Sequence, residues 1–163
     1  MTNHSPSFGT LMLRVLEYLS LERSFTLAVL SPDLIVVEST EKFRDFQGDP
    51  SIVPIGKHVS ELIWELVGSE SGLKEILDGK AEIFSLENIN RDTGNGSIHY
   101  LSLKVIPLIM ERPEDGLLLF VEDTTYTSML EQQLIQDRNE LRLTKSSLSK
   151  ANEELLKLNS LKS

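Results

Sequence analysis

Apolar residues recur at helical spacing at both ends of the chain, and in short strand-like runs between them. Near the N-terminus, the apolar residues have the spacing of one face of an amphipathic helix; they are Leu11, Met12, Val15, Leu16 and Leu19. Near the C-terminus, residues 126–163 carry leucines at every seventh position and contain no Gly or Pro that would end a helix. The pattern predicts an N-terminal helix within residues 1–23, a globular domain over residues 24–125 and a long helix over residues 126–163.

The leucine repeat defines a seam, meaning the a and d positions that face a partner helix in a coiled coil. The seam residues are Leu130, Leu134, Asp137, Leu141, Thr144, Leu148, Ala151, Leu155 and Leu158. In a parallel dimer, Glu140 would face Lys145 of the partner subunit, which favours that orientation. Asp137 and Thr144 bring no apolar side chain to their layers, so a loose stretch is expected between two firmer ones. The alternative is a single amphipathic helix that folds back on its own domain.

Between the helical ends, five β-rich segments are separated by turns. Residues 25–30 and 34–38 flank the turn sequence Ser31-Pro32-Asp33 and predict a hairpin. Three later strands are expected over residues 81–90, 97–108 and 116–123, joined by turns rich in Gly, Asn, Asp and Pro. Such short connections predict that these three strands form an antiparallel meander.

Short helices are expected between the second and third strands. Thr40 is predicted to cap a helix that carries Phe43 and Phe46 on one face. Residues 57–67 predict a second helix and residues 71–77 a third. The inner face of the second helix would hold Val59, Leu62, Ile63 and Leu66. The resulting fold class is α+β, a five-stranded antiparallel sheet with short helices on one face.

The charge balance narrows the choice of partners. The chain has 16 Lys and Arg against 25 Asp and Glu, and no local stripe of basic residues. Because phosphate binding needs clustered cations, nucleic acid is not expected as a partner. No apolar stretch reaches the roughly 18 residues that a membrane helix needs, and the N-terminus lacks the features of a signal peptide. The sequence therefore predicts a soluble cytoplasmic protein that does not bind a membrane.

Four segments carry a resemblance to a known family. Residues 30–43 resemble its opening hairpin and first short helix, with Thr40 at the position of the usual Asn cap. Residues 55–62 resemble its glycine-led helix, and Leu77-Asp78-Gly79-Lys80 its turn into the third strand. Residues 120–125 resemble the strand ending in Asp-Ile-Thr that hands over to an output helix, with Thr124 replacing Ile. On these segments, residues 24–125 resemble a PAS domain, the sensor module of many bacterial signalling proteins.

The resemblance implies a role in signal transduction. It implies a sensory and dimerisation module that relays a signal through a parallel coiled coil to an output domain. Residues 151–163 are similar to the linker before the phosphoacceptor helix of sensor histidine kinases. We therefore expect the N-terminal region of a two-component sensor histidine kinase, cut within a helix, and no catalysis in this chain itself. The rival interpretation is a PAS dimerisation module that senses nothing, in another signalling protein such as a nucleotide cyclase. A small-molecule enzyme is a third.

A ligand pocket would lie between the helices and the sheet, as the resemblance implies. Its predicted lining is Ala28, Val36, Phe43, Ile63, Trp64 and Leu103. The alternative for Trp64 is an aromatic side chain of the core or of an interface. The chain has no cysteine, so cysteine-dependent flavin or cinnamoyl chromophores are excluded, and residues 71–77 contain no histidine that could bind haem. We expect no cofactor and no metal, and a small-molecule ligand, if any, of unknown identity.

The junction Asp123-Thr124-Thr125 is predicted to relay the signal from the sheet to the long helix. Asp123 or Thr125 can accept hydrogen bonds from the first free N–H groups of that helix. Ser128 and Glu131 also have the spacing of a capping box. The alternative is that these residues only cap the helix. His58 and His99 are expected to face solvent, His99 from the outer face of its strand.

Overall fold

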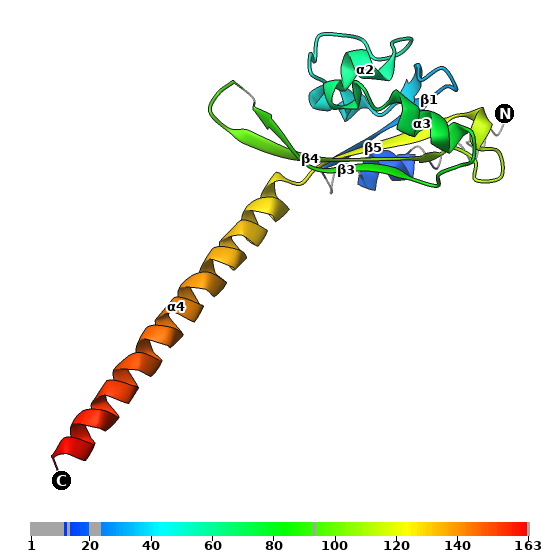
Figure 1. Ribbon diagram of the computed structural model, residues 1–163. Helices are drawn as coiled ribbons and strands as arrows, with labels where there is room; N and C mark the ends of the chain where they lie inside the picture. The colour runs from blue at the N-terminus through cyan, green and yellow to red at the C-terminus, as the bar shows by residue number, and fades with distance from the viewer. Residues whose placement is uncertain (1–11, 13, 20–23, 93, 163) are drawn as a thin grey trace, which may run out of the picture. The chain divides into compact units, whose positions relative to one another are not determined.

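The computed structural model describes residues 12, 14–19, 24–92 and 94–162 (Figure 1). The chain divides into two compact units, Met1–Thr125 and Tyr126–Ser163. The first unit contains a five-stranded antiparallel sheet in the order β2-β1-β5-β4-β3. Its strands are β1 (Phe25–Leu30), β2 (Val36–Ser39), β3 (Phe84–Asp92), β4 (Ile98–Pro107) and β5 (Leu117–Asp123). The predicted α+β fold class is confirmed.

Short helices cover one face of this sheet. They are η1 (Glu41–Phe46), α2 (Val59–Leu62), η2 (Trp64–Leu66) and α3 (Glu70–Leu77), and η3 (Pro113–Asp115) follows β4. Figure 1 shows α2 and α3 on the same side of the sheet. Fully buried apolar side chains from both layers meet between them and include Leu30, Phe43, Leu62, Leu73, Leu103 and Leu119. Burial of these side chains is the main force that holds the layers together.

The third strand contains an irregularity that the sequence did not reveal. The pairing of β3 with β4 shifts between Leu86 and Ile89, and Asn88 has a φ of 56°. Asn tolerates this left-handed conformation better than most residues, so it suits a bulge. Beyond the bulge, Arg91 pairs with His99 close to the turn that joins the two strands.

The predicted helix over residues 57–67 is broken into two pieces. Ile63 is extended, with φ −112° and ψ 94°, and separates α2 from η2. The carbonyl of Leu62 accepts a hydrogen bond of 2.8 Å from the N–H of Gly48, a backbone partner from the preceding loop. The break buries the side chain of Ile63 completely and leaves Trp64 61% exposed. The prediction of one continuous helix is wrong because a loop contact replaces its hydrogen bonding.

Thr40 does not cap η1 with its side chain, contrary to the prediction. Its hydroxyl group instead contacts the hydroxyl of the fully buried Thr26 and accepts from the N–H of Leu27 at 3.2 Å. A buried hydroxyl needs a hydrogen-bond partner, and Thr40 supplies it for Thr26. The residue therefore ties η1 to β1.

Part of the predicted N-terminal helix can be described. Residue 12 and residues 14–19 are helical. The rest of residues 1–23, including Leu11, lies outside the described residues. No helix in the described part of the chain is long and apolar enough to cross a membrane.

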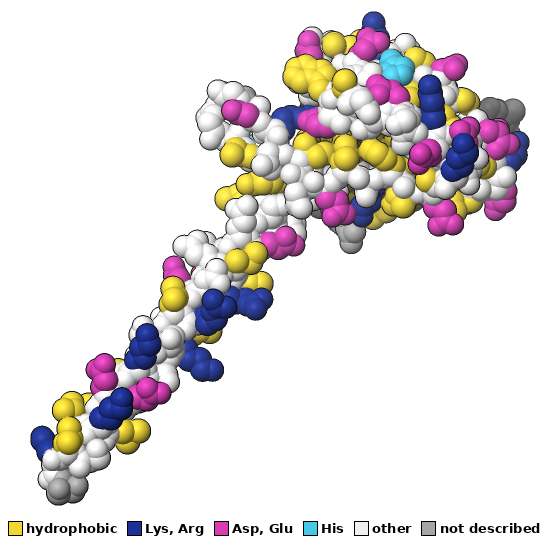
Figure 2. Space-filling model, viewed as in Figure 1, with side chains coloured by type: hydrophobic (Ala, Val, Ile, Leu, Met, Phe, Trp, Pro, Cys, Tyr) yellow, Lys and Arg dark blue, Asp and Glu magenta, His cyan; other side chains and the backbone are white. Residues whose placement is uncertain are grey.

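Helix α4 (Thr125–Leu161) lies in the second unit except for its first residue, and none of its described residues is buried. Its seam leucines are exposed, from 51% for Leu130 to 70% for Leu141. Figure 2 shows hydrophobic side chains on the surface along this helix. Helix α4 begins three residues before Ser128, so Ser128 and Glu131 do not form a capping box at its start.

Candidate functional site

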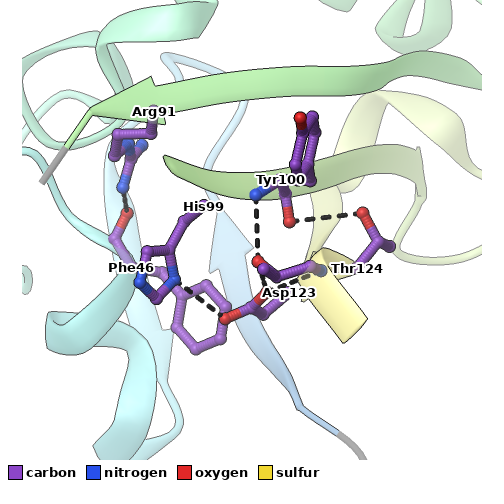
Figure 3. Close-up of polar contacts among 7 residues, drawn as sticks. Phe46, Arg91, His99, Tyr100, Asp123 and Thr124 are labelled. Atoms are coloured by element: carbon purple, nitrogen blue, oxygen red, sulfur yellow. Dashed lines mark hydrogen bonds and ion pairs between the residues drawn. The ribbon is translucent and has the colours of Figure 1, made fainter. Parts of the chain in front are cut away.

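A polar cleft lies where the end of β5 approaches the loop after η1. Its volume is about 480 Å³. We name it the polar cleft after its lining residues, Asp45, Phe46, Gln47, Gly48, Pro50, Arg91, Asp92, His99, Leu101 and Asp123. All of them belong to the first unit. Figure 3 shows the part of this site formed by Phe46, Arg91, His99 and Asp123. The cleft matters because Asp123, a predicted relay residue, forms part of its wall.

Arg91 joins three elements at one side of the cleft. Its Nε and Nη2 atoms donate to the two carboxylate oxygens of Glu65, over 2.8 and 2.7 Å. Its Nη1 atom donates to the carbonyl oxygen of Phe46 at 2.5 Å (Figure 3). The side chains of Arg91 and Glu65 are only 19% and 20% exposed. This two-pronged ion pair connects β3 to η2 and η1, and Glu65 compensates the charge of Arg91.

Asp123 connects the cleft to the first residue of α4. Its Oδ1 atom accepts from the N–H of Thr125 at 2.9 Å and from the Thr125 hydroxyl at 2.5 Å. Its Oδ2 atom lies 3.3 Å from Nδ1 of His99 (Figure 3). One carboxylate therefore contacts both a side chain that lines the cleft and the residue at which α4 begins.

Thr124 and Thr125 attach the same junction to β4. The N–H and hydroxyl groups of Thr124 donate to the carbonyl of Tyr100, over 2.8 and 3.2 Å. The hydroxyl of Thr125 accepts from the N–H of Tyr100 at 3.0 Å. The three residues that the sequence predicted as a relay are thus held by side-chain and backbone hydrogen bonds to neighbouring residues.

Opposing effects set the pKa of Asp123. Partial burial acts to raise the pKa of this carboxyl group. Hydrogen bonds from the side chain and backbone of Thr125, and the hydrogen bond and charge of His99, act to lower it. The result is a pKa below the ordinary value of 3.8, so Asp123 is ionised at neutral pH.

Gln47 contributes an unpartnered acceptor to the cleft wall. The residue is 3% exposed, and its Nε2 atom donates to the carbonyls of Asp49 and Ile52, each at 3.0 Å. Its Oε1 atom has no hydrogen-bond partner. Because turning the amide over would bring Oε1 against those two carbonyls, the unpartnered atom stays an acceptor.

The residues predicted to line a pocket are divided between core and surface. Ala28, Val36, Phe43, Ile63 and Leu103 are all at most 1% exposed and belong to the packed core. Ala28 also borders an apolar cavity of about 310 Å³ that Leu16 and Leu118 help to line. Trp64 does not share the interior with them. Its indole lies against Gly48, where an added Cβ would overlap the ring, so the inward orientation predicted for Trp64 is wrong.

The sequence missed most of the polar cleft. His99 was predicted on the outer face of its strand. It is two residues from the buried Leu101 and four from the buried Leu103, so its side chain lies on the same face of β4 as theirs. Counting outward from the turn predicted at residues 92–96 would pair Arg91 with Ser97, whereas the structure pairs Arg91 with His99, so the sequence did not give this register. Glu65 and Gln47 could not be found either, because the broken helix and the loop that place them have no sequence signal. His58 stands at the start of a helix, where its Nδ1 atom accepts from the N–H of Ser60 and caps α2, and the residue is half-buried.

Known proteins resemble this chain in structure rather than in sequence. No family model matches the sequence, and no curated protein matches it significantly. A phage VqmA–DPO complex matches with a TM-score of 0.55 and 12% identity, over 78% of this chain and 59% of that chain. A sensory box histidine kinase/response regulator from Burkholderia thailandensis matches with a TM-score of 0.51 and 18% identity, over 78% of this chain and 97% of that chain.

This chain has the PAS fold. The resemblance inferred from residues 24–125 is therefore confirmed at the level of the fold. The identities are low, so the likeness concerns the fold alone. The chain also spans only 59% of the VqmA chain, so a substantial part of that protein has no counterpart here.

The exclusion of nucleic acid does not hold. VqmA of Vibrio cholerae, described as a dimer in the absence of its target DNA and as a model for DNA binding by LuxR-type receptors, matches with a TM-score of 0.50 and 15% identity, over 69% of this chain and 52% of that chain. Proteins with this fold therefore include DNA-binding regulators. The net charge of one module does not decide what the rest of a protein binds, which is why the argument from 16 basic and 25 acidic residues failed.

Proposed function

We propose that this chain is a cytoplasmic sensory and dimerisation module that relays a signal from its PAS domain through α4 to an output domain. The observation that carries the proposal is the position of Asp123. This carboxylate lines the polar cleft, lies 3.3 Å from His99 and accepts two hydrogen bonds from Thr125, the first residue of α4. A change in the cleft that moves Asp123 would alter the hydrogen bonds at the start of the helix.

The relay needs an element with two accessible arrangements. In the proposal this element is a parallel coiled coil of two α4 helices. The exposed seam leucines support it, because a 37-residue helix without a buried residue gains little stability from its own surface. Asp137 and Thr144 would weaken the middle of the seam, so two packings could differ by only a few kcal/mol.

The output domain is proposed to be a histidine kinase of a two-component system. The tail over residues 151–163 supports this choice, since it is similar to the linker before a phosphoacceptor helix. The likeness to VqmA favours a second candidate, a ligand-responsive regulator that binds DNA through a domain outside the matched region. Phosphate incorporation from ATP by the full-length parent, measured beside DNA binding, distinguishes the two outputs.

Cysteine cross-linking tests the relay, because the natural chain has no cysteine and each introduced thiol is unique. Leu148→Cys places a thiol in the seam, whereas Leu143→Cys places it outside the seam on a similarly exposed residue. We expect rapid disulfide formation between two chains only for Leu148→Cys. Adding Asp123→Ala should change that rate at least twofold by altering the junction.

Two outcomes would count against the proposal. Equal cross-linking of Leu148→Cys and Leu143→Cys would mean that the seam does not pair as described. An unchanged rate in the Asp123→Ala background, with dimerisation intact by light scattering, would mean that the junction does not communicate with the seam.

A further inference from the structure

We infer that the polar cleft binds a small organic cation, specifically a protonated amine carried on an apolar body. This inference deepens the proposed function and rests on it only for the consequence of binding. It names a ligand class for the cleft, whose wall contains Asp123.

The charge of the cleft favours a cation. Three carboxylates line it, from Asp45, Asp92 and Asp123. Arg91 is the one Lys or Arg among the residues that line it, and its guanidinium group is bound by Glu65 through two hydrogen bonds. Because Glu65 already neutralises Arg91, the carboxylates of Asp45, Asp92 and Asp123 give the cleft a negative charge. A positively charged molecule is therefore attracted and an anion is repelled.

The acceptors of the cleft favour a molecule with N–H donors. Gln47 is almost completely buried, and its Oε1 atom has no partner while its Nε2 atom is held by two backbone carbonyls. A buried acceptor without a donor is costly. Because Oε1 has almost no accessible surface, a donor removes this cost only if the side chains around Gln47 shift when it enters the cleft. Asp123 adds further acceptor capacity at Oδ2, where its contact with His99 is the longest of its three.

The cleft also contains apolar surface. Phe46, Pro50 and Leu101 contribute to its lining, and Leu101 is 4% exposed. A volume of about 480 Å³ falls in the range of sites for single small molecules. The aromatic or aliphatic body of the ligand would contact these three side chains while its ammonium group binds Asp123.

A metal ion is a poorer match for the same residues. In the described part of the chain, no three side chains of His, Cys, Asp or Glu come together in an arrangement that could hold one. The three carboxylates are therefore dispersed along the cleft, which suits an extended organic cation better than a compact ion. An ammonium group that binds Asp123 would compete with His99 for the carboxylate. It would thereby alter the hydrogen bonds that the same carboxylate accepts from Thr125.

Isothermal titration calorimetry with three related probes tests the inference on the whole 163-residue chain. The probes are 2-phenylethylamine, the neutral 2-phenylethanol and the anion phenylacetate. We expect the amine to bind with a dissociation constant below about 1 mM, and the other two at least about tenfold more weakly, because a charged hydrogen bond is lost. Absence of amine binding at 5 mM, or equal binding of phenylacetate, would overturn the inference.

Variants locate the site. Asp123→Asn and Asp45→Asn should each weaken binding of 2-phenylethylamine about fivefold or more, whereas Asp78→Asn, a carboxylate outside the cleft, should not. Asp45 is exposed, so its variant tests the site even if Asp123→Asn folds poorly. Unchanged affinity in Asp45→Asn and in a folded Asp123→Asn would place the amine elsewhere and reject the cleft.

Cross-linking of Leu148→Cys, with and without the amine, separates this inference from the proposed function. Binding without a change in cross-linking would leave the ligand site in place and reject the relay. If cross-linking depends on Asp123 but the amine does not bind, the relay is supported and the ligand site is rejected.

Discussion

Leucine has opposite environments in the two units of the chain. In the PAS domain Leu103 and Leu119 are fully buried, whereas Leu141 and Leu143 on α4 are 70% and 66% exposed. Charge differs as well, since residues 1–125 have ten basic against twenty acidic residues and residues 126–163 have six against five. The first unit encloses its own core, and the second presents apolar side chains without enclosing any.

This difference indicates where each unit obtains its stability. Burial of apolar surface within one chain stabilises the PAS domain. Beyond Thr125, which bonds to Asp123 and Tyr100, the described residues of α4 have backbone hydrogen bonds and local pairs, such as the bond from Gln133 to Asp137 at 2.9 Å. Mutations that remove the same leucine atoms should therefore have unequal effects in the two units.

The largest expected effect is in the core. Leu103→Ala should lower the free energy of unfolding by about 2–5 kcal/mol, because it removes buried methyl groups and leaves a cavity. The matched change Leu143→Ala should stay within about 0.5 kcal/mol. Urea denaturation followed by circular dichroism measures both, because the helical signal includes α4 while the single tryptophan lies in the first unit. Similar losses for the two variants would contradict the division into a packed unit and an exposed one.

The next prediction sharpens the comparison on the side of the helix. Asp137→Leu should raise the stability of the proposed dimer by at most about 1.5–3 kcal/mol per side chain, because it completes a seam layer. Asn139→Leu adds a leucine to the same turn outside the seam and serves as the control. Sedimentation equilibrium and thermal melting measure the change. If both variants behave alike, position 137 is not in the seam and the register is wrong.

A smaller effect is expected at the ion pair beside the cleft. Arg91→Met should cost about 2 kcal/mol, since it leaves the carboxylate of Glu65 unpaired at 20% exposure. Arg112→Met is the control, because the pair of Arg112 with Asp115 spans 3.2 Å at 62% and 36% exposure and should contribute less than about 1 kcal/mol. Chemical denaturation provides both values. Equal costs would mean that partial burial adds nothing to the Arg91 pair.

The smallest effect concerns pH. The lowered pKa of Asp123 means that the ionised carboxyl group stabilises the folded state above its unfolded pKa of about 3.9. That contribution should be lost as the pH falls through the lower folded value. The stability difference between the natural chain and Asp123→Asn should therefore shrink below about pH 4.

Thr125→Val removes one donor and should raise the pKa of Asp123 in an NMR titration, while an unchanged value would show that this hydroxyl has no influence.

The main features of the fold were predictable because they follow from local patterns. The strand positions, the antiparallel meander and helix α3 follow from apolar runs and turn residues, and the structure confirms them. The break at Ile63 was not predictable, since it depends on a contact between Gly48 and Leu62 that only tertiary packing creates.

The candidate site was predictable only where it follows the chain. Asp123, Thr124 and Thr125 are consecutive, so a helix start after a strand was enough to select them. Arg91 and Glu65 are 26 residues apart and come together through the fold. A single sequence does not show which of many charged residues will meet in this way. Their role as a signal relay remains a prediction, as does the pairing of the seam.

The position of Trp64 has a practical consequence for spectroscopy. It is the single tryptophan of the chain, its indole lies against Gly48 in the wall of the polar cleft, and the next residue, Glu65, binds Arg91. Any displacement of that wall changes the polarity around the only strong fluorophore. The intensity and wavelength of tryptophan emission should therefore report events in the cleft directly, without an attached dye.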